Sequence, residues 1–208
     1  MQSVQYKLIE FFLLFIVLPI AFTFNYAFQV KLVIGFVGFL YVLYILLKVN
    51  KNTFKIDEHI NWASFWKQTI IKFLLIVIIT TTYVWITDKQ VLFNVVLNKP
   101  TLWIIILFVY SLLSVYPQEL IYRTFFFQRY EMLFKNKKLF IFVNAVVFSL
   151  GHIFFRNNLV IVLTFLGGLL FAVTFYKTKS TLLVSIEHAI YGCWLFTVGM
   201  GNMLGFPS

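Results

Sequence analysis

The stretch Leu159–Tyr176, LVIVLTFLGGLLFAVTFY, has no charged side chain. A helix needs about 20 predominantly apolar residues to cross the hydrocarbon core of a bilayer, and this stretch approaches that length. Continuous apolar runs predict transmembrane helices, whereas a transmembrane barrel requires alternation along each strand. Six further runs of the same kind are Leu8–Phe24, Leu32–Leu47, Ile70–Ile86, Leu102–Tyr116, Leu139–Phe155 and Leu182–Met200. We therefore predict an all-α, polytopic transmembrane helical bundle with seven clear spans.

The overall composition excludes a soluble globular protein. Of the 208 residues, 62% are hydrophobic and only 12% are charged, whereas about 25% of the residues in soluble domains are charged. The net charge of +10 comes from lysines clustered between the apolar runs. We therefore assign these charges to membrane topology and expect no nucleic-acid partner. The single cysteine, Cys193, excludes an intrachain disulfide.

The segment Pro117–Phe134 is mixed, because charged and polar side chains stand among aromatic ones. We expect Pro117 to kink it away from the preceding span, which gives about eight helices. If the segment makes no separate crossing and the N-terminus is cytoplasmic, the assigned basic residues divide twelve to four, as the positive-inside rule requires. The cytoplasmic group is Lys7, Lys48, Lys51, Lys55, Lys67, Lys72, Arg129, Lys135, Lys137, Lys138, Lys177 and Lys179, and the outer group is Lys31, Lys89, Lys99 and Arg156. We therefore favour a bent or partial span in an integral multi-pass protein of a bacterial cytoplasmic membrane.

The chain is predicted to form one integral membrane domain, 1–208. The polar loop Lys48–Ile60 divides the helices of 1–60, which we expect to be peripheral, from the remainder. Trp62 and Trp66 follow this loop at the end of a run, where aromatic residues anchor helices at the membrane interface.

Ionisable residues within or beside the apolar runs are the candidates for chemistry, because a charge near the bilayer centre costs at least about 2.5–3.5 kcal/mol. Glu119 and Arg123 are four residues apart, so they share a helical face within reach of an ion pair. For that pair alone, a structural salt bridge is the alternative interpretation. His152 and His188 lie on two further spans, and this combination indicates a functional site between helices.

A polar stripe accompanies His152 on its helix. Asn144, Phe148 and His152 recur at intervals of four residues, which places them on one face. We expect this face to contact protein, with Asn144 and Phe148 supporting the site.

A carboxylate and two imidazoles inside a bundle are compatible with three kinds of chemistry. In hydrolysis, the carboxylate takes a proton from water while a histidine positions the water or stabilises the oxyanion. In a zinc site, Glu119, His152 and His188 would bind the metal and leave one position for water. In a transporter, the same groups would relay protons or ions. The residues by themselves leave all three open.

Three motifs follow one another along the second half of the chain: Gln118–Arg123 (QELIYR), Phe148–His152 (FSLGH) and His188–Gly192 (HAIYG). They resemble the motifs of the type II CAAX prenyl endopeptidase-like family, also called the CPBP or Abi intramembrane proteases, over residues 102–200. The resemblance implies an endopeptidase, of glutamic type or metal-dependent, that hydrolyses a peptide bond of a membrane-associated peptide or protein. It implies catalytic roles for Glu119, His152 and His188, and supporting roles for Gln118, Arg123, Phe148 and Asn144.

Two positions depart from the family pattern. Gln118 stands where the family has its first glutamate, the usual proton acceptor, so that role falls here to Glu119. Gly192 stands at the polar position of the third motif. An oxyanion donor is then left to Asn144, Gln118 or Tyr191. These departures keep open a second hypothesis, a catalytically inactive family member that acts as a bacteriocin-immunity or partner-binding membrane protein.

Overall fold

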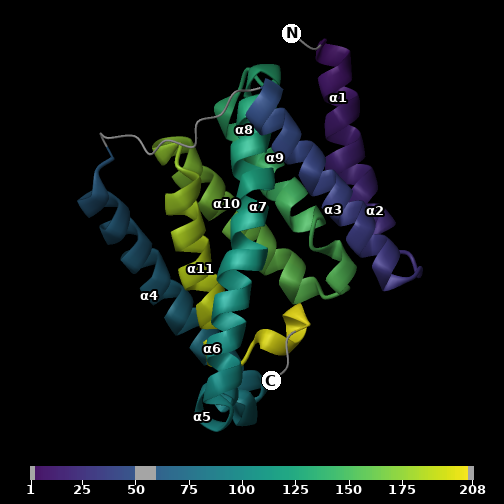
Figure 1. The fold of residues 1–208 in the computed structure, drawn as a ribbon. Coiled ribbons are helices and arrows are strands. Elements are labelled where there is room, and N and C mark those ends of the chain that lie inside the picture. Colours follow the sequence, from purple (N-terminus) through teal and green to yellow (C-terminus); the bar gives the residue numbers. More distant parts are fainter. Residues whose placement is uncertain (1–2, 50–59, 206–208) are drawn as a thin grey trace.

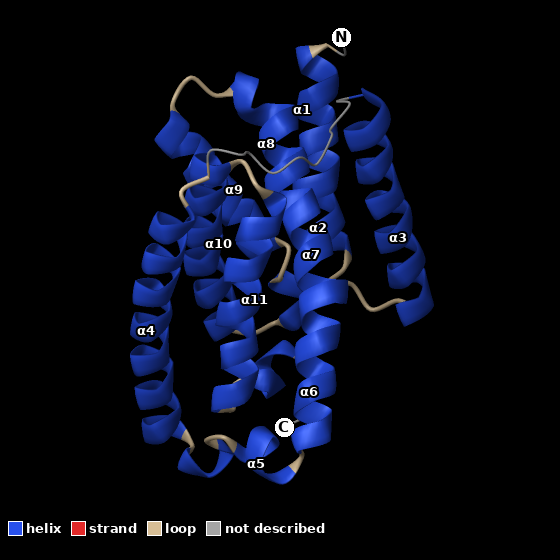
Figure 2. Cartoon of the chain, turned by 60° about the vertical axis from the view of Figure 1, so that its left-hand side comes forward, coloured by secondary structure: helices blue, strands red, loops and turns tan. Residues whose placement is uncertain are grey.

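The computed structural model describes residues 3–49 and 60–205, which are mainly helical and contain no strand (Figure 2). Seven helical segments are long and apolar enough to cross a membrane: Val4–Ala21, Phe28–Val49, Trp62–Thr87, Pro100–Leu133, Lys137–Phe155, Asn158–Thr178 and Thr181–Val198. The predicted all-α polytopic bundle is therefore confirmed. Its helices are α1 (Val4–Phe12), α2 (Leu18–Ala21), α3 (Phe28–Tyr44), α4 (Trp62–Thr87), α5 (Asn94–Asn98), α6 (Pro100–Val109), α7 (Tyr116–Glu119), α8 (Phe126–Tyr130), α9 (Lys137–Leu150), α10 (Asn158–Thr178) and α11 (Thr181–Val198).

The last span occupies the middle of the bundle. Half of Thr181–Val198 is buried, whereas only 17% of the 18-residue apolar window within Trp62–Thr87 is buried. Helices α3 and α4 form opposite flanks, with α7, α9, α10 and α11 between them (Figures 1 and 2). His188, on α11, is therefore carried by the helix with the most protein around it.

The mixed segment after Pro117 belongs to the same candidate span as the run before it, as expected for a segment that makes no separate crossing. It continues the preceding span as one helical stretch, Pro100–Leu133, and adds no crossing of its own. Proline lacks the N–H needed for the regular hydrogen bond and clashes with the preceding turn. A wide π-helical turn, Tyr110–Val115, precedes Pro117 and accommodates it, because the N–H of Tyr116 bonds the carbonyl of Ser111 five residues back. A second wide turn, Leu120–Phe125, follows.

The same device occurs in the first span. The wide turn Leu13–Val17 precedes Pro19, and the N–H of Leu18 bonds the carbonyl of Leu13. Both prolines are therefore carried inside continuous helices.

The N-terminal helices are attached to the remainder by a buried ion pair. Glu10 of α1 accepts hydrogen bonds from Arg129 Nε at 2.6 Å and from the Tyr130 hydroxyl at 3.0 Å, both on α8. The hydroxyl of Tyr41 on α3 also donates to this carboxylate. Phe15 packs beside them in the main aromatic core. The peripheral character of 1–60 stays a prediction.

Most of the predicted polar loop Lys48–Ile60 lies outside the described residues, and so do Lys51 and Lys55. The division of basic residues between the two sides, and with it the cytoplasmic N-terminus, stays a prediction.

Candidate active site

A cavity of about 590 Å³ lies among the long helix Pro100–Leu133 and helices α4, α9, α10 and α11. Most of its lining side chains are apolar. Each of the three motifs contributes a polar residue to its wall: Gln118 from the first, His152 from the second and His188 from the third. The fold thus gathers residues from three helices around one space.

Glu119 lies behind this wall and is wholly buried. Its Oε1 is 2.7 Å from His188 Nδ1, and its Oε2 is 3.4 Å from Arg123 Nε. The predicted ion pair between positions 119 and 123 is therefore present. Glu119 does not line the cavity itself, so its connection to the cavity runs through His188.

The Arg123 guanidinium, also wholly buried, lies on aromatic rings. Its Cζ is 4.5 Å from the centre of the Phe148 ring and 5.8 Å from that of Phe171. A cation held over an aromatic face is stabilised by the ring quadrupole, most strongly when desolvated. This contact gives Phe148 a supporting position in the site, beneath the cation that pairs with Glu119.

Both nitrogens of the His188 ring have partners. Nδ1 meets the Glu119 carboxylate, and Nε2 is 3.1 Å from the Tyr110 hydroxyl. The ring stacks on Phe171 with centroids 4.3 Å apart and planes 21° from parallel. A carboxylate on one side and a ring on the other fix the imidazole in one orientation.

Tyr110 was missed by the sequence prediction. It lies in the wide turn Tyr110–Val115 and lines the cavity. A Cβ atom added at Gly192 would overlap its hydroxyl. The unusual glycine of the third motif thus leaves room for a tyrosine from another helix. The only signal in the sequence was the glycine, and it did not indicate which residue would fill the space.

His152 lies just after α9 and lines the same cavity. Its Nδ1 is 2.7 Å from the carbonyl oxygen of Phe148. A carbonyl only accepts hydrogen bonds, so Nδ1 carries the proton and Nε2 is the acceptor of the neutral ring. The rings of His152 and His188 both contact Phe148, with centroids 4.8 and 5.8 Å from it.

Asn144 is buried away from the cavity. Its Nδ2 donates to the carbonyl oxygen of Tyr122 at 2.6 Å. Tyr122 belongs to the second wide turn, where the helical hydrogen bonds are displaced. The predicted supporting residue therefore joins α9 to this turn.

Gln118 and Tyr191 also make hydrogen bonds within the protein. Gln118 Nε2 donates to Ser114 Oγ at 2.8 Å. The Tyr191 hydroxyl contacts the Thr69 carbonyl at 3.1 Å and the Glu187 carboxylate at 2.9 Å, and both of these groups are acceptors. Glu187 itself is buried and paired with Lys72.

The donor set does not fit a metal. Across residues 3–49 and 60–205, no three His, Cys, Asp or Glu side chains are grouped so that they could hold an ion. Glu119 directs one oxygen to His188 and the other toward Arg123. The zinc set of Glu119, His152 and His188 is therefore not formed, and we derive no step from a metal.

Comparison with known proteins gives one match. No curated protein and no solved structure matches the chain. The match is to a protein family, it includes all three motifs, and it implies a protease in a helical membrane protein. Residues 100–194 match the family described as Type II CAAX prenyl endopeptidase Rce1-like, which confirms the resemblance that the motifs predicted.

Proposed function

We propose that the protein is an intramembrane endopeptidase that hydrolyses a peptide bond of a membrane-associated substrate, using water activated by Glu119 through His188. The observation that carries this proposal is the contact of 2.7 Å between Glu119 Oε1 and His188 Nδ1 at the cavity wall. A carboxylate bonded to Nδ1–H fixes the tautomer of an imidazole and leaves Nε2 as a base. Glu119 therefore acts on water through His188, and not by direct contact as its motif suggested.

His152 supplies the second imidazole of the proposed mechanism. Since its Nδ1 is held by the Phe148 carbonyl, its Nε2 is the atom that accepts a hydrogen bond from water. Arg123 and Phe148 keep the Glu119 carboxylate in place rather than meet the substrate.

The oxyanion donor is assigned to Tyr110 in this proposal. Asn144 and Gln118 each donate one hydrogen bond to another group, and the Tyr191 hydroxyl donates within a buried pair of acceptors. The Tyr110 hydroxyl lies at the cavity and donates to the unprotonated His188 Nε2 at 3.1 Å. In the proposed mechanism, Nε2 takes a proton from water and stops accepting this hydrogen bond, so the Tyr110 hydroxyl then donates to the oxyanion. A phenol that donates to a developing oxyanion stabilises the transition state more than the ground state.

The first experiment tests the dyad. Wild-type protein in nanodiscs is incubated with a library of lipid-anchored peptides, and cleavage is followed by mass spectrometry. His188→Gln and His152→Ala should each reduce cleavage by about 10²–10⁴-fold, the range for general acid–base catalysis. Full turnover by a folded His188→Gln protein would remove the dyad from the mechanism.

The second experiment tests Tyr110 against its neighbour. Tyr110→Phe should lower kcat by about 10²–10³-fold, as for other oxyanion donors. Tyr116→Phe, an exposed tyrosine on the same helical stretch, is the control and should leave kcat unchanged. Gly192→Asn alone should abolish activity, because the new side chain overlaps the Tyr110 hydroxyl. Gly192→Asn with Tyr110→Ala removes this overlap and should recover part of the activity. Undiminished kcat in Tyr110→Phe would refute the assignment.

A second candidate function is an inactive family member that acts in bacteriocin immunity or partner binding. It is favoured by Gln118, an amide at the cavity wall, combined with a Glu119 that is wholly buried. An immunity or binding phenotype complemented by a variant lacking Glu119, His152 and His188 would support it. Cleavage by Gln118→Glu but not by the wild-type protein would also support this second function.

A further inference from the structure

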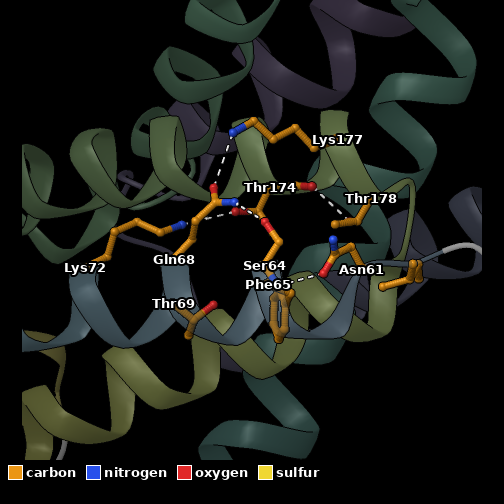
Figure 3. Close-up of a pocket in the computed structure, with 10 residues that line it drawn as sticks. Asn61, Ser64, Phe65, Gln68, Thr69, Lys72, Thr174, Lys177 and Thr178 are labelled. Carbon is orange, nitrogen blue, oxygen red and sulfur yellow. Dashed lines mark hydrogen bonds between the residues drawn. The ribbon is translucent and has the colours of Figure 1, made fainter.

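A second cavity, of about 280 Å³, lies between the first half of α4 and the end of α10 (Figure 3). It shares no lining residue with the candidate active site. Its polar lining includes Ser64, Gln68, Lys72, Thr174, Lys177 and Thr178. Side chains from the two helices face each other across it.

The charge around this cavity is positive. Two lysines line it, and no acidic side chain does so within the described part of the chain. Lys177 is exposed, and its Nζ is 3.3 Å from a neutral amide oxygen of Gln68. Lys72 is paired with Glu187, which is buried behind it. Lys177 is therefore the cation best placed to meet an anion.

Two hydroxyl groups add donors. Ser64 Oγ accepts from Gln68 Nε2 at 2.9 Å, and Thr174 Oγ1 accepts from Lys72 Nζ at 3.4 Å. A hydroxyl that accepts one hydrogen bond still has its own proton to donate. An ammonium flanked by hydroxyls suits the oxygens of a phosphate group.

The depth of the cavity matches that of lipid headgroups. Trp62 and Trp66 are exposed on the first turns of α4, beside the cavity. Such tryptophans mark the membrane–water interface. Lys177 lies in the last turn of α10 at the same end. Basic pockets between membrane helices at this level bind anionic headgroups.

We propose that this cavity binds the phosphate group of an anionic phospholipid headgroup. The lipid lies between α4 and α10, with its phosphate on Lys177, Ser64 and Thr174 and its acyl chains along the exposed apolar face of α4. This site is independent of whether the chain is a protease.

The test uses the full chain in neutral detergent micelles. Phosphatidylglycerol is titrated in, binding is measured by native mass spectrometry, and the melting temperature is recorded. The key variant is Lys177→Gln. Its matched control is Lys67→Gln, which removes an exposed charge from the same end of α4 without lining the cavity. The Lys177 variant should weaken binding about fivefold more than the control, since one lysine contributes about 1 kcal/mol to headgroup binding.

Further arms identify the source of the phosphate. Inorganic phosphate should compete with phosphatidylglycerol but give less thermal stabilisation, because it has no acyl chains. Equal stabilisation by inorganic phosphate alone would overturn the assignment to a lipid. Equal weakening by the two lysine variants would overturn the site. If Lys177→Gln does not fold, Thr174→Val and Ser64→Ala are measured against the same control.

Discussion

Two buried carboxylate–arginine pairs occur among the residues that the structure describes, and they are built differently. Glu10 and Arg129 join α1 to α8 with hydrogen bonds of 2.6 and 3.1 Å, and the hydroxyls of Tyr41 and Tyr130 also donate to the carboxylate. Glu119 and Arg123 approach only to 3.4 Å. Within the described residues, neither Glu119 Oε2 nor the Arg123 guanidinium nitrogens have a hydrogen-bond partner.

The proposed function accounts for the difference as that between a structural pair and a pair within the site. A buried ion pair contributes to stability only when its remaining lone pairs and protons are satisfied. The Glu10 pair meets this requirement. The Glu119 pair leaves polar atoms without a hydrogen-bond partner among the described protein groups, and its carboxylate is directed to His188 beside a cavity. Unsatisfied buried groups are expected where a site is prepared for chemistry.

The most direct test of this difference between the two pairs is to neutralise each carboxylate in turn. Glu119→Gln should reduce peptide cleavage by about 10²–10⁴-fold, because His188 loses the carboxylate that holds its Nδ1–H. Glu10→Gln should retain most of the cleavage activity in protein that remains folded. Both are measured as kcat in nanodiscs. Equal losses from two folded variants would show that the two pairs do not differ in function.

The next effect concerns stability. Glu10→Ala should lower the free energy of unfolding by about 3–5 kcal/mol, because the buried Arg129 guanidinium loses the Glu10 carboxylate to which it donates two hydrogen bonds. Unfolding in mixed micelles measures this change. Glu10→Ala together with Arg129→Met should recover part of the loss, since an apolar pair of similar size carries no unpaired charge. A loss below that of an ordinary surface substitution would contradict the structural role of the pair.

The smallest effect tests the hydrogen bonds around Glu10. Tyr130→Phe removes one donor and should cost about 1–2 kcal/mol, since a hydrogen bond to a charged group is lost from a buried site. Tyr44→Phe, an exposed tyrosine on α3, should cost nothing measurable in the same unfolding assay. Cleavage should be unchanged in both variants, and a selective loss in Tyr130→Phe would connect the N-terminal helices to catalysis.

The membrane spans could be predicted from the sequence because burial in lipid requires long apolar runs, and each of the seven runs lies mainly within one span. The local pairs of the site were also predictable. Glu119 and Arg123 are four residues apart within one helical stretch, so their pairing follows from helix geometry. His152 contacts Phe148 as the spacing predicted, although it lies after the end of α9.

Contacts across the bundle were not predictable from one sequence. Tyr110 reaches His188 across 78 positions, and Arg129 reaches Glu10 across 119. The continuous helix through Pro117 depends on a wide turn that has no simple sequence signature. The direction in which Glu119 points depends on the same wide turn. Its position behind His188 could therefore be seen only in the structure.

The wide turns have a consequence for how this protein tolerates changes in length. Each residue of an α-helix rotates the chain by about 100°, so a deletion within α10 would reorient every side chain that follows it. A wide turn already holds one surplus residue. Loss of a residue between Ser111 and Val115 would convert that turn to regular helix. Glu119 and Arg123 would then stay on the face of the helix that they occupy now. Related chains that differ by a single residue in this helix are therefore expected to carry the gap here, with their motifs in register on either side.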